Sequence, residues 1–320
     1  MQGLTMSLMN VTQKAAIASF PWIGKGEKNK ADGASTEAMR NQLNRMDLNG
    51  MVVIGEGEMD QAPMLYIGEK LGNGNGPQLD IAVDPIDGTR LVAKGTGNAI
   101  AVIAASEKGS LLHAPDMYMK KIAVGPAAAG SVDIEAPLIE NMKAVAEATG
   151  KDVSDLNIMI QDRKRHEDLI GQVQSVGASV KLFSDVDITG VIATAIDELE
   201  VDMLVGTGGA PEGVVAAVAM KCLGGDFQGK LVPQNPAEYD RCRQMGLTQP
   251  DIKLTLTDLV RSENCMFSAT GITDGMLLKG VHQKGDGSLS AHSFTCDGSS
   301  HYHFVETIFK KSEKKPQFNR

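Results

Sequence analysis

The sequence predicts an α/β protein, and three observations carry this prediction. The chain has 320 residues, 42% of them hydrophobic, and 35 glycines, which suits one large or two smaller compact domains. Between residues 157 and 222, apolar runs alternate with helical patterns, as in a parallel sheet with crossover helices. Beyond residue 269, short strands are separated by Asp-Gly turns, as in a β-meander.

The first 120 residues are expected to mix helices with strands. Apolar residues at helical spacing predict helices at 8–17 and 39–46 and a helical segment at 64–70. Apolar runs predict strands at 51–54, 79–84, 98–105 and 111–119, the last ending near Tyr118. Because proline has no backbone N–H to donate to a β-ladder, Pro85 should end the second of these strands at Asp84.

The remainder of the chain shows clearer periodicity. A helix at 139–146 is closed by Gly150. The alternating region predicts strands at 157–161, 179–183 and 201–205 and helices at 165–175, 188–198 and 213–222. The meander strands are expected at 275–283, 289–296 and 302–309, and the polar, basic tail at 310–320 is expected to be disordered.

Two carboxylates follow the apolar run that ends near Asp84. Asp84 and Asp87 lie three residues apart across an expected turn, so both can face one hard cation. Gly88 and Thr89 then open the next segment with backbone N–H groups available to an anion. Asp-Pro and Asp-Gly pairs also form ordinary turns and helix caps, so these residues alone support a structural role equally well.

Two further acids strengthen the interpretation as a metal site. Glu56 follows the strand at 51–54, and Asp32 precedes the helix that carries Met39. Asp32 has a structural alternative, because aspartate at that place is also a common helix N-cap. Three separate segments therefore offer carboxylates near the ends of secondary-structure elements.

Polar clusters also follow the predicted strands of the alternating region, where ligands of parallel sheets bind. The first is the basic run Arg163, Lys164 and Arg165, placed at a helix start, where cations are unfavourable unless an anion binds. The second contains Asp185 and Asp187, and the third leads from Gly209 to Glu212. As structural alternatives, the basic run is a charged helix start and Glu212 a favourable first-turn carboxylate.

Charge and cysteine content narrow the class of protein. A formal net charge of −9 argues against a nucleic-acid surface. The four cysteines are widely spaced, without disulfide or zinc-site patterns, and are expected to be reduced thiols. The N-terminus lacks a signal-peptide pattern, and no apolar run reaches the roughly 18 residues of a membrane span. We therefore expect a cytoplasmic protein that binds neither nucleic acid nor membrane.

Taken in order, these motifs resemble a known superfamily. Asp32-Gly33, Gly55-Glu56-Gly57-Glu58 and Asp84-Pro85-Ile86-Asp87-Gly88-Thr89 are similar to motifs of the metal-dependent, lithium-sensitive sugar and inositol phosphatases. The segments at 62–69, 114–119, 208–213 and 267–271 narrow the resemblance to the class II fructose-1,6-bisphosphatases, over about residues 10–280.

The resemblance implies a fold and a division of labour. The implied fold is a layered α-β-α-β-α sandwich, with a mixed N-terminal sheet and a second sheet built from alternating strand-helix units. It further implies a metal-binding half at 1–150 and a sugar-phosphate-binding half at 151–309, joined around one cleft. A homo-oligomer, dimer or tetramer, is also implied.

The resemblance assigns roles to individual residues. Two or three Mg²⁺ or Mn²⁺ ions would be held by Asp32, Glu56, Asp84, Asp87 and Glu212. Thr89 and Asp32 would activate water, and the substrate would contact Asp87, Gly88, Thr89, Tyr118, Arg163, Lys164, Arg165, Asp185, Asp187 and Gly209. The sequence departs from the family pattern at Val186, where a glycine is more usual.

The implied activity is hydrolysis of fructose 1,6-bisphosphate to fructose 6-phosphate, a step of gluconeogenesis. Sedoheptulose 1,7-bisphosphate and inositol monophosphates are alternative substrates, although a single phosphate would not need the basic run. A non-catalytic nucleotide-binding regulator is a third possibility if Gly206-Thr207-Gly208-Gly209 forms a dinucleotide loop. No acidic residue follows at the end of the next expected strand, which argues against that loop.

Overall fold

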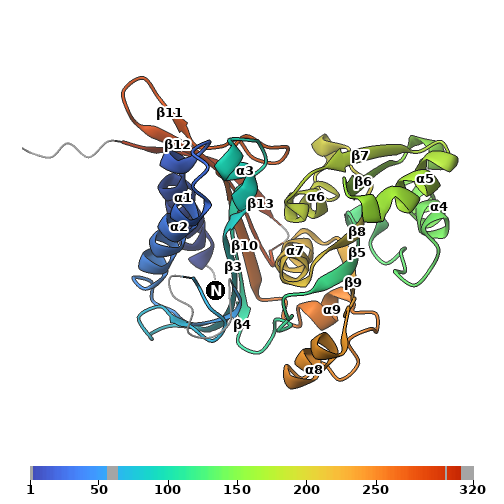
Figure 1. Cartoon of the computed structure of the whole chain (residues 1–320), viewed down its shortest axis with the longest axis horizontal. Helices are drawn as coiled ribbons and strands as arrows, with labels where there is room; N and C mark the ends of the chain where they lie inside the picture. Colours follow the sequence, from blue (N-terminus) through green and yellow to red (C-terminus); the bar gives the residue numbers. More distant parts are fainter. Residues whose placement is uncertain (1–2, 56–63, 300, 311–320) are drawn as a thin grey trace, which may run out of the picture.

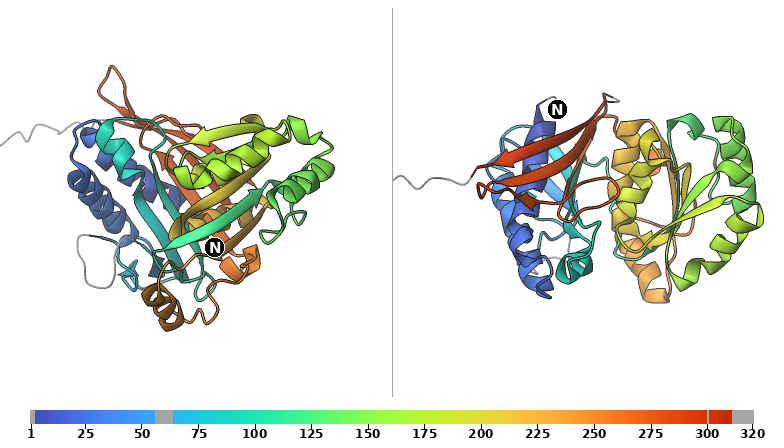
Figure 2. Two further views of the ribbon diagram at one scale, coloured as in Figure 1. Left: turned by 45° about the vertical axis from the view of Figure 1, so that its right-hand side comes forward. Right: turned by 90° about the horizontal axis from the view of Figure 1, so that it is seen from above.

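Helices and sheets alternate in layers across the molecule. The computed structural model describes residues 3–55, 64–299 and 301–310. Helices α1 and α2 cover the outer face of a first sheet, α6 and α7 lie between the two sheets, and α4 and α5 cover the outer face of the second sheet (Figures 1 and 2). The expected α-β-α-β-α sandwich is confirmed.

The helices and strands have the following bounds. The α-helices are α1 (Leu4–Ser19), α2 (Lys28–Leu43), α3 (Thr89–Lys94), α4 (Leu138–Thr149), α5 (Glu167–Ser175), α6 (Asp187–Ala193), α7 (Ala210–Leu223), α8 (Pro236–Gln244) and α9 (Leu256–Leu259). The strands are β1 (Asn49–Ile54), β2 (Lys70–Leu71), β3 (Gln78–Asp87), β4 (Ile100–Glu107), β5 (Tyr118–Val124), β6 (Asn157–Gln161), β7 (Ser179–Phe183), β8 (Met203–Gly209), β9 (Asp226–Leu231), β10 (Cys265–Gly271), β11 (His282–Gln283), β12 (Leu289–Asp297) and β13 (Tyr302–Phe309).

The first sheet is mixed and has eight strands in the described part of the chain. Its order is β11-β12-β10-β4-β3-β1-β2, with β13 paired to β12. Only the β1–β3 pairing is parallel among these described strands. Strands β10 to β13, from the C-terminal part of the chain, thus join the same sheet as β1 to β4 from the N-terminal part.

The second sheet has five strands, in the order β7-β6-β8-β5-β9. The strands β7, β6 and β8 are parallel, as the strand-helix alternation predicts. The strand β5, however, lies antiparallel between β8 and β9. Because β5 precedes the alternating region by more than thirty residues, local periodicity carries no information about its place.

Both sheets therefore draw strands from both sides of residue 150. β5 joins the second sheet from the first side, and β10 to β13 join the first sheet from the second side. The division into a metal-binding half at 1–150 and a sugar-phosphate-binding half at 151–309 stays a prediction. The tail at 311–320 lies outside the described residues.

Helix α7 owes its central place to its composition. Alanine, valine and methionine surround its axis, and every residue from Gly213 to Met220 is buried. A helix that is apolar on all sides is stable only inside a protein. It contacts β10 and β4 of the first sheet and β9, β5 and β8 of the second. Within the described residues, no helix is long and apolar enough to cross a membrane.

Several local predictions were wrong, among them the strand expected at 275–283, of which only β11 at His282–Gln283 forms. The strand β3 does not end at Asp84 but continues to Asp87, because a register shift against β4 accommodates Pro85. The described residues at 64–69 form turns rather than a helix, and Tyr118 begins its strand instead of ending it. Apolar spacing alone cannot distinguish a buried loop from a helical turn.

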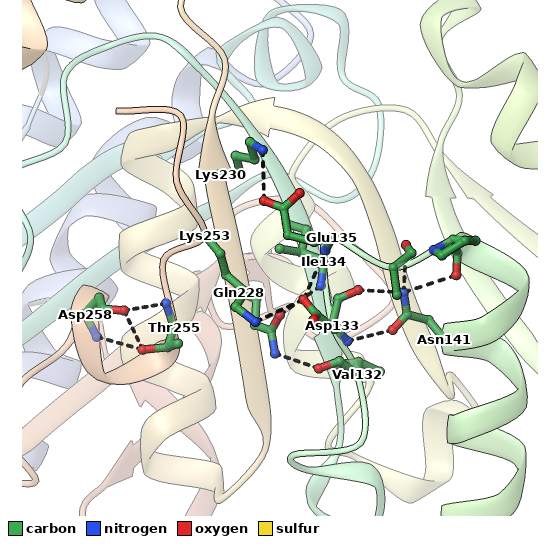
Figure 3. A network of polar contacts seen from close by, with 12 residues as sticks. Val132, Asp133, Ile134, Glu135, Asn141, Gln228, Lys230, Lys253, Thr255 and Asp258 are labelled. Carbon is green, nitrogen blue, oxygen red and sulfur yellow. Dashed lines mark hydrogen bonds and ion pairs between the residues drawn. The ribbon is translucent and has the colours of Figure 1, made fainter. Parts of the chain in front are cut away.

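A network of side chains fixes the loop between β5 and α4 to strand β9 (Figure 3). The Gln228 side chain accepts a hydrogen bond from Ile134 N–H (2.9 Å) and donates one to Val132 O (2.8 Å). Asn141 closes the same loop, since its side chain accepts from Asp133 N–H and donates to Asp133 O. Gln228 is buried, so its bonds satisfy backbone groups that water does not reach.

We expect Gln228→Leu to lower the free energy of unfolding by about 1–3 kcal/mol, because it leaves the Ile134 N–H and the Val132 carbonyl without these partners. Gln174→Leu at an exposed position of α5 is the matched control, with an expected change within about 0.5 kcal/mol. Urea unfolding measures both. Equal effects of the two substitutions would show that the loop is held by other contacts.

Candidate active site

The end of β3 brings two acids to one place. Residues three apart in a regular strand face opposite sides of the sheet. The register of β3 against β4 shifts between Asp84, opposite Val102, and Asp87, opposite Ile100. This bulge lets both carboxylates approach Glu212, whose charge acts on each of them. The Asp84 side chain also accepts a hydrogen bond from Ile86 N–H (2.9 Å), which orients it.

Glu212 reaches the same place from the layer between the sheets. It lies in the first turn of α7, directly after β8, where a carboxylate interacts favourably with the helix dipole. A side chain at Gly209 would overlap the Glu212 carboxylate, so glycine is required there for this approach. Glu212 Oε2 and Asp87 Oδ2 are buried and accept no hydrogen bond from the described residues. Buried acceptors of this kind are costly unless a ligand satisfies them.

Burial and mutual repulsion shift the ionisation of these acids. Burial, with the charges of Glu212 and Asp32, raises the pKa of Asp84 to about 8. Burial, together with the charges of Asp84, Glu212 and Asp187, raises the pKa of Asp87 well above its ordinary value. Burial also raises the pKa of Glu212, against the opposing effect of Lys121. A bound cation would reverse these shifts by stabilising the charged forms.

Lys121 is a charged group of the site that sequence reasoning missed. It lies in β5, only 2% of it is exposed, and its Nζ is 2.5 Å from Asp187 Oδ2. Its positive charge opposes the raised pKa of both Asp87 and Glu212. The available signal was the adjacent pair Lys120 and Lys121 in a strand, since consecutive strand residues face opposite sides and one of them must point inward.

Two of the other predicted metal and catalytic residues, Asp32 and Thr89, lie in helices α2 and α3. Asp32 is not an N-cap, because α2 begins at Lys28 and places Asp32 inside the helix, close enough to influence Asp84. Thr89 is the first residue of α3, and Gly88 takes the cap position in the left-handed conformation (φ 96°). Glu56 lies outside the described residues. Among described residues, no three potential ligands already have metal-binding geometry.

A cavity of about 360 Å³ gathers most of the predicted substrate residues. Acids, the start of α3 and part of the basic run line it, and these residues include Asp87, Gly88, Thr89, Tyr118, Arg163, Arg165, Asp185, Asp187, Gly209 and Glu212. Lys164 does not line it and is exposed. A neighbouring cavity of about 310 Å³ shares Glu212 and reaches Asp84.

Several polar contacts hold the arginine side chains that line the cavity. The Arg165 guanidinium donates two hydrogen bonds to Thr207 O, from Nε (3.0 Å) and Nη2 (2.7 Å), and lies 5.0 Å from the centre of the Tyr118 ring. Arg163 forms an ion pair with Asp185. Both arginines are therefore oriented before any ligand arrives.

Val186 has an unusual backbone conformation at the edge of the cavity. Its φ is 72°, in the left-handed region that β-branched residues rarely adopt, and its side chain is buried. It packs toward Gly88, where an added Cβ would lie 3.0 Å from Val186 Cγ2. A glycine at this position would adopt this conformation without strain.

We expect Val186→Gly to be more stable than Val186→Ala by about 1 kcal/mol, although glycine is normally the less stable of the two. Both substitutions remove the two γ-methyl groups of Val186, but only glycine relieves the strain at φ 72°. Thermal unfolding of the two variants measures the difference. A more stable alanine variant would show that Val186 is not strained in solution.

The chain is similar to known proteins over nearly its whole length. The family model described as bacterial fructose-1,6-bisphosphatase, glpX-encoded, matches residues 2–309. Fructose-1,6-bisphosphatase 1 class 2 of Escherichia coli K12 is 46% identical over 296 residues, covering 88% of each chain. Fructose-1,6-bisphosphatase class 2 of Haemophilus influenzae is 45% identical, covering 97% of this chain and 98% of its own.

Among solved structures, extragenic suppressor protein suhB from Bartonella henselae is 14% identical with a TM-score of 0.35, covering 61% of this chain and 74% of its own. That likeness is too small to carry a conclusion. The family match over residues 2–309 and the two close relatives show that the chain belongs to the bacterial, glpX-encoded fructose-1,6-bisphosphatase family.

Proposed function

We propose that the protein hydrolyses fructose 1,6-bisphosphate to fructose 6-phosphate and phosphate with the help of bound divalent cations. One observation carries the proposal: a single cavity is lined both by acids, including Asp87 and Glu212, and by the oriented arginines Arg163 and Arg165. A sugar bisphosphate has the matching chemistry, with one phosphate to be cleaved beside the acids and one to be held by the arginines. Relatives at 45–46% identity are named for this activity.

The acids fit a hard divalent cation. Their donors are carboxylate oxygens, which Mg²⁺ and Mn²⁺ prefer, and two of these oxygens are buried without a hydrogen-bond donor in the described chain. Asp32, Asp84, Asp87 and Glu212, with Glu56, would hold two or three ions. Such ions supply Lewis-acid chemistry, namely activation of water and neutralisation of the charge that develops on the leaving oxygen.

The chain's own groups would bind and orient the substrate. The backbone N–H groups of Gly88 and Thr89 would hold the phosphate that is cleaved. Tyr118, Arg163 and Arg165, with Lys164 near the cavity rim, would hold the far phosphate. Asp185, Asp187 and Gly209 would contact the sugar.

Thr89 would position the attacking water. Its hydroxyl would accept a hydrogen bond from the water and donate its own proton toward a carboxylate, with Asp32 as the final base. Gly88 takes the N-cap position of α3 and Thr89 is its first helical residue, so the Thr89 hydroxyl is not needed as the cap.

The alternative functions differ in how well the cavity fits them. Sedoheptulose 1,7-bisphosphate has two phosphates and suits the same cavity, whereas an inositol monophosphate would leave the arginines without a phosphate. A dinucleotide loop is disfavoured, because Gly206 to Gly209 belong to strand β8. We place the enzyme in the cytoplasm, as a homo-oligomer, on the basis of the family resemblance.

The direct test is phosphate release from fructose 1,6-bisphosphate, sedoheptulose 1,7-bisphosphate, fructose 1-phosphate and inositol 1-phosphate, each with Mg²⁺ and with Mn²⁺. We expect turnover of the first substrate at the highest kcat/KM. A higher kcat/KM for inositol 1-phosphate would refute the proposed substrate class.

We expect Asp84→Asn to abolish phosphate release and to weaken Mn²⁺ binding measured by calorimetry, because it removes an anionic ligand from the cluster. Glu147→Gln, at an exposed position of α4, is the control and should change neither. Normal Mn²⁺ affinity in Asp84→Asn would remove Asp84 from the ligand set.

Asp84→Asn should also change the pH dependence of stability in the metal-free protein. Folded Asp84 keeps its proton to about pH 8, whereas the unfolded chain releases it near the ordinary pKa of about 3.9. Between these values the folded state binds more protons, so wild-type stability should fall as pH rises from about 4 to 8. Chelator-treated Asp84→Asn should show a shallower fall, which thermal unfolding across this range measures.

We expect Thr89→Ala to lower kcat about 100-fold, because the attacking water loses its placement, and Thr89→Ser to keep part of the activity. Since Gly88 and not Thr89 is the N-cap of α3, the melting temperature should barely change. Thr96→Ala, just beyond the other end of α3, is the control. If Thr89→Ala keeps a kcat within a few-fold of wild type, another group positions the water.

A further inference from the structure

His166 follows the basic run directly, yet it points into the protein instead of the cavity. Only 1% of the residue is exposed. Its ring lies between the ends of β6 and β8, with Nδ1 2.8 Å from Gln161 O and Nε2 2.9 Å from Thr207 N. Gly206 permits this close packing, since an added Cβ there would lie 3.2 Å from the His166 ring.

The two contacts define the protonation of the ring. The Thr207 N–H donates to Nε2, so Nε2 is an acceptor and carries no proton. Nδ1 must then carry the single ring proton and donate it to Gln161 O. Burial lowers the pKa of His166, and the nearby charges of Arg165 and Arg163 lower it further. His166 is thus a neutral imidazole with both nitrogens in use.

Consecutive residues therefore hold the two backbone polar groups of one residue, Thr207. His166 accepts a hydrogen bond from the Thr207 N–H, and Arg165 donates two to the Thr207 carbonyl. Arg165 also donates to Gln161 Oε1 (2.9 Å) while its guanidinium lies over the Tyr118 ring. Thr207, within strand β8, is therefore the fixed point that orients the Arg165 guanidinium.

We propose that His166 is a positioning residue for the far-phosphate site: it fixes Thr207 relative to β6 and so holds Arg165 and Tyr118 in the geometry that binds phosphate. This inference rests on the proposed function, in which Arg165 contacts the second phosphate. His166 itself touches no substrate in this arrangement. Its loss should weaken binding of the far phosphate and leave the chemistry at the acids unchanged.

The test compares ligands that differ only in the far phosphate. Fructose 6-phosphate has this phosphate, and fructose 1-phosphate has only the one that is cleaved. We expect His166→Leu to raise the Kd of fructose 6-phosphate and the KM of fructose 1,6-bisphosphate about tenfold or more, by displacement of the phosphate-binding fork. The kcat for fructose 1,6-bisphosphate and the kcat/KM for fructose 1-phosphate should stay within about twofold of wild type, because the transition-state contacts at the acids remain.

Two amides refine the test and cover the case in which the leucine variant fails to fold. Glutamine can place an oxygen near the position of Nε2, so His166→Gln should keep the Thr207 bond and near-normal fructose 6-phosphate affinity. Asparagine reaches only the position of Nδ1, so His166→Asn should weaken fructose 6-phosphate binding as His166→Leu does. His303→Leu, at an exposed position of β13, is the control for loss of a histidine.

Arg165→Ala separates the inference from the function on which it rests. If Arg165→Ala leaves the affinity for fructose 6-phosphate unchanged, the proposed phosphate site is wrong. If Arg165→Ala weakens binding but the asparagine and glutamine variants of His166 bind alike, the role of His166 is overturned and the site stands. Equal losses on fructose 1-phosphate and fructose 6-phosphate would likewise show that His166 only supports the fold.

Discussion

The arrangement of this protein depends on keeping several buried carboxylates close together. Asp84 and Asp87 come from a bulge in the first sheet, and Glu212 comes from the helix between the sheets. Burial and like charge both disfavour their ionised forms, as the raised pKa values show. Positive charge must enter this place, and the proposed divalent cations are its natural source.

The chain supplies one such charge itself. Lys121 comes from β5, the strand placed between β8 and β9, and pairs with Asp187 at the start of α6. A buried lysine without a partner would be strongly unfavourable, so the ion pair fixes both groups. The topology of the second sheet therefore has an electrostatic consequence, because β5 places the positive charge of Lys121 next to acids that come from other layers.

The arginines that line the cavity are oriented in advance for binding a phosphate. Arginine side chains lose considerable conformational freedom when they bind a phosphate, and prior orientation reduces that cost. Contacts with Thr207, Gln161, Asp185 and Tyr118 hold Arg163 and Arg165 before binding. The strained backbone at Val186 also lines this cavity, directly before Asp187.

The sequence alone determined the local features of this protein. Apolar periodicity placed β6 at 157–161 and β7 at 179–183, and Gly150 and Glu212 marked the end of α4 and the start of α7. Motif order indicated the acids at 32, 84, 87 and 212 and the basic run at 163–165. These features depend on neighbouring residues, so a linear pattern is sufficient to reveal them.

Only the tertiary structure decided which distant segments meet. The bulge that carries β3 past Pro85, the insertion of β5, the return of β10 to β13 and the burial of Lys121 and His166 all follow from long-range pairing. These features produce no periodic pattern in the sequence. The free energy that stabilises each of them comes from contacts between residues far apart in the chain. From the sequence alone, a lysine or histidine is expected at the surface, and only the packing of the folded chain shows which groups surround it.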